Sequence, residues 1–202
     1  LGRFARGEID VLVGTQMVAK GHDFPRVTLV GVVSADVGLG MADFRAAERT
    51  FQLLTQVAGR AGRGELPGEV IVQTLYPDHY SIRLACQQAY EPFFQEEMRF
   101  RESMRYPPAV ALVNVVVRGT DPNATTKGAA LLVRQVRKQQ GQFEVLGPAP
   151  APIARLRGQF RMQLFLKGSS RREMREAIEA VLTQHPELKR HVVVDVDPVT
   201  ML

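Results

Sequence analysis

Apolar residues follow two different patterns along the chain, one on each side of a proline pair near residue 107. In the first part, β-branched runs predict strands and an apolar stripe predicts a helix; the strands are expected at 11–13, 27–33 and 68–74, and the helix at 44–58. The run at 27–33 is almost continuously apolar, which is typical of a parallel strand covered on both faces. This order predicts the end of a doubly wound α/β lobe with a parallel sheet.

Residues 78 to 104 have a helical pattern, with a predicted break near Pro92. The sequence Tyr106-Pro107-Pro108 stops this pattern, because proline lacks a backbone N–H and its ring clashes with the preceding turn. We therefore predict a lobe over residues 1–77, a helical link over 78–108 and a second domain over 109–202.

The second domain alternates strand and helix patterns in a different order. Four strands are expected, at 110–118, 143–146, 161–167 and 191–197. One helix begins at Asp121-Pro122, and another at Ser170, whose spacing to Glu173 forms a capping box. The order β-α-β-β-α-β predicts a ferredoxin-like α+β domain with an antiparallel sheet. The proline-rich segment 147–152 is expected to be a stiff loop.

Composition indicates a globular protein with an uneven charge. Of 202 residues, 45% are hydrophobic and 23% charged, and no apolar run approaches the ~20 residues of a membrane span. Residues 1–104 hold 11 Lys+Arg and 13 Asp+Glu, whereas residues 105–202 hold 15 and 8. The second part therefore carries a net charge of +7, which favours an anionic partner such as nucleic acid over a merely solvated basic surface. The single cysteine, Cys86, is expected to be buried, and a reducing, cytoplasmic setting is expected.

The sequence Gln56-Val57-Ala58-Gly59-Arg60-Ala61-Gly62-Arg63 carries candidate chemistry. On a helix, Gln56, Arg60 and Arg63 would fall on one face. A glutamine and two guanidinium groups on one face suit a triphosphate, whose transferred phosphoryl spreads negative charge over several oxygens. The alternative is a solvated helix end with two surface arginines.

A second candidate motif begins at Gly14-Thr15 and runs through Lys20-Gly21-His22-Asp23-Phe24-Pro25. A strand would deliver this loop at its carboxyl end, where open α/β sheets bind ligands. Thr15 can donate its hydroxyl to a phosphate, and Asp23 can accept a hydrogen bond from a ribose hydroxyl. The alternative is an ordinary strand–turn–helix connection in which Asp23 is a helix cap.

A third candidate is the basic connection 153–161. It places Arg155, Arg157 and Arg161 beside Phe160. Arginine pairs with phosphate and an aromatic ring can stack on a base, so this loop is a candidate nucleic-acid contact. The alternative is a hairpin arm with solvated arginines and with Phe160 in the core.

Together the first two motifs resemble motifs VI and V of superfamily-two helicases, which lie in the second RecA-like lobe. Within that superfamily, further matches resemble the replication-restart DNA helicases; they are Gly14–Met17, Lys20–His22, Ala42–Arg49, Tyr106–Pro108, Leu146–Pro148 and Asp195–Pro198. The resemblance covers nearly the whole chain. It implies the second half of RecA-like lobe 2 over residues 1–77 and a DNA-fork-binding domain over 109–202.

The resemblance also implies an activity and partners. The parent would be an ATP-dependent 3′-to-5′ DNA helicase that remodels stalled or branched forks for primosome assembly, with single-strand-binding protein and other primosome proteins as partners. Its cofactors would be ATP and Mg²⁺, with zinc only in a region upstream of this chain. No G-x-x-x-x-G-K-[ST] phosphate loop occurs in the chain, so the fragment alone is expected to be inactive.

The resemblance assigns roles to individual residues. Arg60 and Arg63 would stabilise charge on the γ-phosphate, and Gln56 would orient groups near them. Asp23 and Gly21 would lie at the nucleotide, while Thr15 and Lys20 would hold a phosphate of single-stranded DNA. Two alternatives stay open, namely another superfamily-two translocase and a non-catalytic DNA-binding protein with a helicase remnant.

Overall fold

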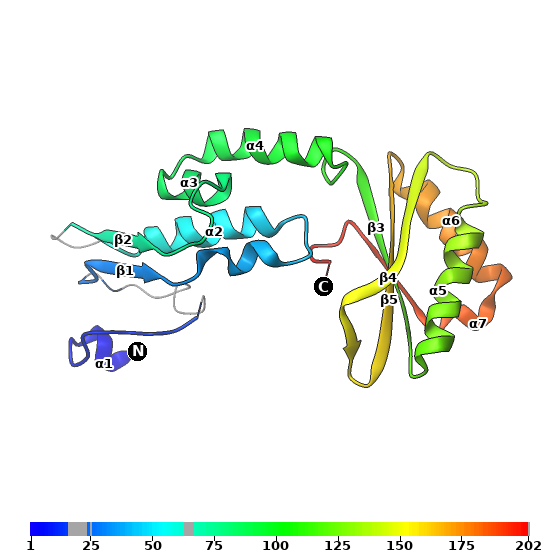
Figure 1. The fold of residues 1–202 in the computed structure, drawn as a ribbon, viewed down its shortest axis with the longest axis horizontal. Helices are drawn as coiled ribbons and strands as arrows, with labels where there is room; N and C mark the ends of the chain where they lie inside the picture. The colour runs from blue at the N-terminus through cyan, green and yellow to red at the C-terminus, as the bar shows by residue number, and fades with distance from the viewer. Residues whose placement is uncertain (16–23, 25, 63–66, 202) are drawn as a thin grey trace. The chain divides into compact units, whose positions relative to one another are not determined.

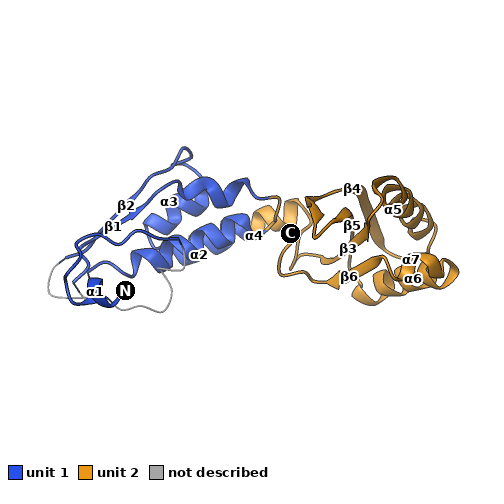
Figure 2. Cartoon of the chain, turned by 90° about the horizontal axis from the view of Figure 1, so that it is seen from below, with its two compact units in different colours: residues 1–41, 45–97 blue, residues 42–44, 98–202 orange. Residues whose placement is uncertain are grey.

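The computed structural model describes residues 1–15, 24, 26–62 and 67–201. The chain divides into two compact units, coloured separately in Figure 2. The first unit contains residues 1–41 and 45–97, and the second contains residues 42–44 and 98–202. Each described helix is too short or too polar to cross a lipid bilayer.

The first unit is built on two parallel strands, β1 and β2, in register from Leu29 opposite Glu69. Helix α2 lies between them in sequence and packs against β1 and α3 (Figure 1). The elements are α1 (Gly2–Ala5), β1 (Leu29–Val32), the 3₁₀ helix η1 (Ala35–Gly40), α2 (Ala46–Ala58), β2 (Glu69–Val72), α3 (Tyr80–Cys86) and α4 (Tyr90–Ser103), which continues into the second unit.

Packing in the first unit centres on one apolar stripe of α2. Phe51 and Leu54 of α2 meet Ile82 and Leu84 of α3, and Phe51 stacks on Phe93 of α4 with ring centroids 4.0 Å apart. The stripe arises because these positions recur at helical spacing. It confirms the predicted helix, although α2 begins two residues later than expected.

Several predictions for the first unit are wrong in detail. Residues 11–13 form no strand, and the side chains of Val11 and Val13 are 71% and 88% exposed. The helical stretch breaks at Gln88, whose φ is 52°, and not at Pro92. Pro92 lies in the first turn of α4, where the missing N–H breaks no intrahelical hydrogen bond. Cys86 is exposed, not buried.

The second unit is a four-stranded antiparallel sheet in the order β4-β5-β3-β6, with α5 and α6 on one face (Figure 1). The order β-α-β-β-α-β along the chain confirms the predicted ferredoxin-like arrangement. The elements are β3 (Ala111–Gly119), α5 (Pro122–Val136), β4 (Phe143–Leu156), β5 (Gln159–Gly168), α6 (Arg171–Gln184), α7 (Pro186–Lys189) and β6 (Val192–Val196).

Alternating apolar residues of the sheet and the apolar stripes of α5 and α6 form the main core of the second unit. Both helices begin at side-chain caps. The carboxylate of Asp121 accepts from the backbone N–H of Ala124 at 2.8 Å, and the Ser170 hydroxyl accepts from that of Glu173 at 3.2 Å. The Glu173 carboxylate accepts from the backbone N–H of Gln142 at 3.1 Å, which ties the start of α6 to the residue before β4.

The segment 147–152 belongs to strand β4 and is not the predicted loop. β4 is an edge strand, so its prolines remove no hydrogen bond from a central ladder. Two register shifts relative to β5, between Leu146 and Ala149 and between Pro150 and Arg155, accommodate them.

The face of this sheet opposite α5 and α6 is partly covered by segments distant in sequence. Phe44 stacks on Tyr106 with centroids 5.2 Å apart, and both contact Leu112 and Met201. The carboxylate of Asp43 accepts from the backbone N–H of Met201 at 3.2 Å. Residues 42–44, from within the predicted lobe, therefore help to build the second unit.

Candidate nucleotide-coupling loop and nucleic-acid interface

The candidate phosphate-binding motif lies at the end of α2 and beyond it. Gln56 is half-buried in the last turn, but the helix ends at Ala58, and Arg60 follows in a turn whose backbone N–H donates to Val57 O at 2.9 Å. The prediction that Gln56 and Arg60 share a helix face is therefore wrong. Arg63 lies outside the described residues.

Two glycines fix the loop that carries Arg60. Gly62 has a φ of 69°, which L side chains rarely adopt, and its N–H donates to Val27 O at 3.1 Å. A Cβ on Gly62 would come within 2.7 Å of Gly68 N. The glycines thus permit close backbone contact beside the amino ends of β1 and β2, and Arg60 lies in the turn that leads to this contact.

The remaining helicase-like candidates are only partly described. Thr15 is exposed on an irregular segment, and Lys20, Gly21 and Asp23 lie outside the described residues. Of the candidate residues of these two motifs, the structure therefore describes Thr15, Gln56 and Arg60, and the last two are four residues apart in sequence.

The carboxyl edge of the two-stranded sheet is occupied by protein groups. The carboxylate of Asp36 accepts from the backbone N–H of Leu75 at 2.9 Å, and this hydrogen bond, with a smaller contribution from the Thr74 side chain, lowers the pKa of Asp36. The backbone N–H of Ala35 donates to Gln73 O at 2.9 Å. Asp36 therefore has a structural role that the sequence did not indicate.

The basic connection 153–161 is a β-hairpin. Leu156 pairs with Gln159, and the two residues between them, Arg157 and Gly158, have φ values of 49° and 78°. Positive φ at both central residues is the signature of a type I′ turn, whose twist matches that of the flanking strands. Arg157 is therefore exposed at the tip of the hairpin.

Arg155 covers Phe160 on this hairpin. The two residues pair across β4 and β5, and the Arg155 guanidinium carbon lies 5.2 Å from the centroid of the Phe160 ring. Phe160 is half-buried and outside the main core. The alternative that placed Phe160 in the core is therefore wrong, but a base could stack on the ring only if Arg155 moved. Arg161 donates to Ile153 O at 3.3 Å, across the same hairpin.

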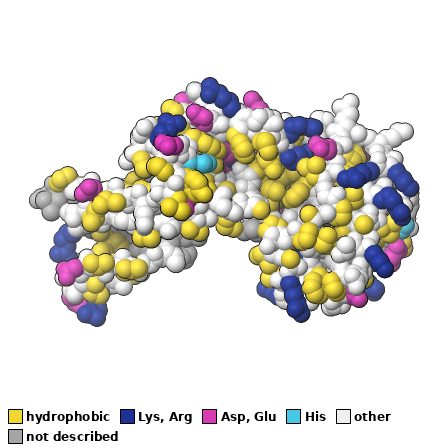
Figure 3. Space-filling model, viewed as in Figure 1, with side chains coloured by type: hydrophobic (Ala, Val, Ile, Leu, Met, Phe, Trp, Pro, Cys, Tyr) yellow, Lys and Arg dark blue, Asp and Glu magenta, His cyan; other side chains and the backbone are white. Residues whose placement is uncertain are grey.

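The hairpin arginines lack acidic partners, unlike several other arginines of the second unit. Arg171, Arg172 and Arg105 pair with Asp197, Glu176 and Glu144, respectively. Within the described part of the chain, no carboxylate forms an ion pair with Arg155, Arg157 or Arg161. Lys and Arg side chains also line much of the outer margin of this unit in Figure 3. The hairpin therefore presents uncompensated positive charge.

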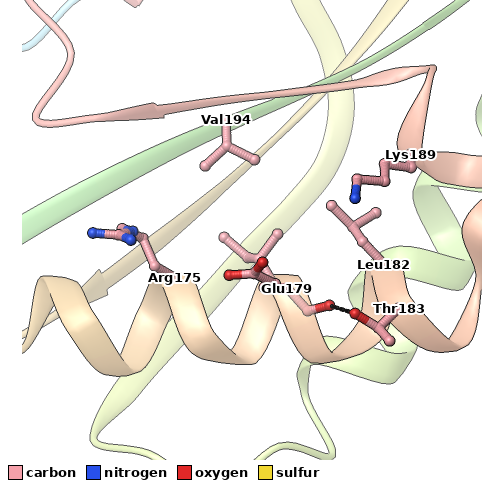
Figure 4. Close-up of a pocket in the computed structure, with 7 residues that line it drawn as sticks. Arg175, Glu179, Leu182, Thr183, Lys189 and Val194 are labelled. Atoms are coloured by element: carbon pink, nitrogen blue, oxygen red, sulfur yellow. Dashed lines mark hydrogen bonds between the residues drawn. The ribbon is translucent and has the colours of Figure 1, made fainter.

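A shallow hollow of about 200 Å³ lies between α6, α7 and β6 (Figure 4). Its lining mixes the apolar Ile178, Leu182 and Val194 with charged side chains at the rim, and the Thr183 hydroxyl donates to the backbone of Glu179 at 2.9 Å. This volume is smaller than that of typical small-molecule sites. No group of three or more His, Cys, Asp or Glu side chains in the described residues is arranged to hold a metal ion.

Comparison with known proteins identifies the family. Residues 1–65 match the family described as helicase conserved C-terminal domain, and residues 102–199 match the primosomal protein N C-terminal domain. The replication restart protein PriA of Bacillus subtilis is 42% identical over 200 residues, which cover 98% of this chain and 25% of that protein. The chain belongs to the PriA family.

Other PriA proteins match over the same extent. Those of Synechocystis sp. and Haemophilus influenzae are 43% and 41% identical, over 100% and 96% of this chain. The matches cover 24% and 27% of those relatives, so the chain spans about a quarter of the length of the PriA proteins it matches. These matches confirm the predicted resemblance to the family of replication-restart helicases.

Proposed function

We propose that this chain is part of an ATP-dependent 3′-to-5′ DNA helicase that remodels stalled or branched forks for primosome assembly and replication restart. The observation that carries the proposal is the identity of about 40% to PriA proteins over the whole chain, together with the helicase match at residues 1–65. Both matched families are present in one chain and in the same order as the two described units.

The first unit would contribute to nucleotide use in the full-length parent. ATP and Mg²⁺ would supply the phosphoryl group and its counter-ion. Arg60 and Arg63 would stabilise negative charge on that group, Gln56 would orient its neighbours, and Asp23 and Gly21 would lie at the nucleotide. The backbone hydrogen bonds of Arg60 and Gly62 support such a role, since they hold the backbone of this loop in one conformation.

DNA would contact both units. Thr15 and Lys20 would hold a phosphate of single-stranded DNA, and Arg155, Arg157, Arg161 and Phe160 would form a second contact in the domain over 109–202, beyond a helical link. Single-strand-binding protein and other primosome proteins would be partners. We place the parent in the cytoplasm, at the nucleoid, with zinc bound only upstream of this chain.

The nucleotide role is tested in the full-length parent. Arg60→Ala and Arg63→Ala should each lower DNA-stimulated ATP turnover on the order of 10³-fold, with a much smaller change in DNA affinity. Arg83→Ala removes an exposed arginine of α3 and is the matched control. Near-normal turnover in either test variant would show that the motif has been misassigned.

An ATPase assay of the isolated chain is a second test of the nucleotide role. Because it contains no phosphate loop, purified chain should show no DNA-stimulated ATP hydrolysis. Turnover that co-purifies with the chain and disappears in Arg60→Ala would contradict this expectation.

Two alternatives lead to different results with the parent. Another superfamily-two translocase would unwind RNA or translocate without unwinding forked DNA, so unwinding assays on matched DNA and RNA forks separate it from a replication-restart helicase. A non-catalytic DNA-binding protein would bind forks but hydrolyse no ATP.

A further inference from the structure

Three neighbouring strands of the second unit place basic residues at the same end of the sheet. Arg118, near the end of β3, is in register with Arg161, near the start of β5. On the other side of β3, the backbone N–H of Arg118 donates to the carbonyl oxygen of His191, just before β6, at 2.8 Å. With strands about 4.8 Å apart, these residues form one row across the sheet.

His191 links the backbone of Arg118 to the side chain of its own neighbour, Arg190, which we include in this row. Its Nδ1 lies 3.1 Å from the carbonyl oxygen of Arg118, and its Nε2 lies 3.0 Å from Nε of Arg190. A carbonyl oxygen only accepts and a guanidinium nitrogen only donates, so both hydrogen bonds form when the imidazole is neutral and carries its proton on Nδ1. In this form His191 holds the Arg190 side chain next to the end of β3.

The positive charge of this row is uncompensated. Within the described part of the chain, no ion pair involves Arg118, Arg161 or Arg190. The acidic side chains nearest in sequence have other partners, because Asp121 caps α5 and Glu187 pairs with His185. Arg118 and Arg190 are exposed and Arg161 is half-buried, so all three present charge to solvent, and none of them has an ion-pair partner in the described part of the chain.

The row continues the basic hairpin. Arg161 belongs to both, and Arg155 and Arg157 follow on the hairpin at the same end of the sheet. We propose that Arg118, together with Arg190 as positioned by His191, extends the DNA contact of the hairpin into a phosphate-binding row across the ends of β5, β3 and β6. This inference rests on the proposed DNA-binding function of the second unit.

The chemistry of the row favours phosphate over bases. Apart from the imidazole of His191, both of whose nitrogens are hydrogen-bonded within the protein, the row contains no aromatic side chain, and the ring of Phe160 is covered by Arg155. The exposed neighbour on β6, Val193, offers only an aliphatic surface. Guanidinium groups without base-reading partners bind the backbone and confer no sequence preference.

A salt series with the full 202-residue chain tests the row. Binding to a fluorescein-labelled oligo(dT) strand is followed by anisotropy for the wild type and for the double variant Arg118→Gln/Arg190→Gln. Each lost phosphate contact should flatten the slope of log K against log salt by about 0.7, so the double variant should lose about 1.4 units and bind roughly tenfold more weakly at low salt. A mixed-sequence strand should give the same losses.

Matched variants show whether the loss of binding depends on the number of positive charges or on their position in the row. Arg172→Gln removes one positive charge from an arginine that is paired with Glu176 and should leave the slope unchanged. Arg118→Lys/Arg190→Lys keeps both charges and should retain most of the slope. If Arg118→Gln/Arg190→Gln behaves like Arg172→Gln while Arg155→Gln/Arg157→Gln flattens the slope, the row is wrong and the hairpin site stands. If the wild-type chain shows no salt-dependent binding, the proposed DNA contact of this unit is wrong as well.

A double-mutant cycle tests the role of His191 as a positioning residue. His191→Ala should weaken binding in the wild-type background but have little further effect in Arg190→Gln, because its contribution acts through Arg190. An equal loss in both backgrounds, or a loss that follows a lowered melting temperature, would show that His191 is only structural.

Discussion

The two units differ in how completely each covers its own sheet. In the second unit, the central strand β3 has seven consecutive buried residues, and both of its faces are packed. In the first unit, β1 and β2 alternate between exposed and half-buried positions, and Leu29 and Ile71 are 56% and 54% exposed. Two strands rarely suffice for an independently stable sheet, so the stability of the first unit depends on α2, α3 and α4.

The two units therefore differ in which elements contribute most to the free energy of folding. The second unit contains a core of fifteen buried apolar residues, most of which have almost no contact with water. In the first unit, the buried apolar side chains lie mainly in the helix cluster around Phe51 and Phe93, and the strands contribute less to this packing. We therefore expect substitutions in the sheets of the two units to have very different effects.

The largest expected effect is Leu164→Ala in β5. Leu164 is fully buried in the main core, so its truncation should lower the free energy of unfolding by about 2–5 kcal/mol. Ile71→Ala is the matched control in β2; because its side chain is already half exposed, it should cost less than about 1 kcal/mol. Urea denaturation followed by circular dichroism measures both, and equal losses would remove the distinction between the units.

A medium effect is expected at the loop of the first unit. Gly62→Ala introduces a Cβ at a positive φ and within 2.7 Å of Gly68 N, so this loop should become less stable by about 1–3 kcal/mol. Hydrogen exchange should report faster exchange at the amino ends of β1 and β2 and no change in the second unit. Gly158→Ala, at a positive φ but in open space, is the control at the hairpin tip. Unchanged exchange in the first unit would show that the loop tolerates the Cβ.

Sequence patterns predicted the second unit well because its signals are local. The alternation of Met162, Leu164 and Leu166, and the caps at Asp121 and Ser170, are each visible within a few residues. Proline content misled the prediction at 147–152, because pairing with β5 keeps this edge segment extended. The contact between Arg118 and His191 joins residues far apart in sequence, so no local pattern indicates it.

In the first unit, local signals were less informative. The apolar run at 11–13 has high strand propensity, but a strand forms only where a neighbour supplies hydrogen bonds, and the described residues supply none to this segment. The predicted end of α2 at residue 58 is confirmed, but Gly59 ends the helix before Arg60, so the helix face assumed for Gln56 and Arg60 does not exist. The residue types at Gln56 and Arg60 therefore did not indicate the backbone conformation, and their chemical role stays a prediction.

The smallest expected effect is an acid sensitivity confined to the first unit. His79 caps α3, and its Nδ1 accepts from the backbone N–H of Ser81 at 3.3 Å. Burial lowers the pKa of His79, with a smaller opposing effect of Glu97. Because the unfolded chain binds this proton more readily than the folded one, stability should fall as the pH drops below the ordinary histidine pKa of about 6.5.

His79→Asn tests this point because asparagine is a good helix cap that does not titrate in this range. At neutral pH the variant should melt within a few degrees of the wild type, since the cap is kept. Between pH 7.5 and 5.5 its melting temperature should fall less than that of the wild type, and hydrogen exchange at the start of α3 should become less dependent on pH. If the pH dependence of the variant equals that of the wild type, the acid sensitivity arises from another group. If the exchange difference appears in the second unit instead, the two units do not respond to acid separately as their packing indicates.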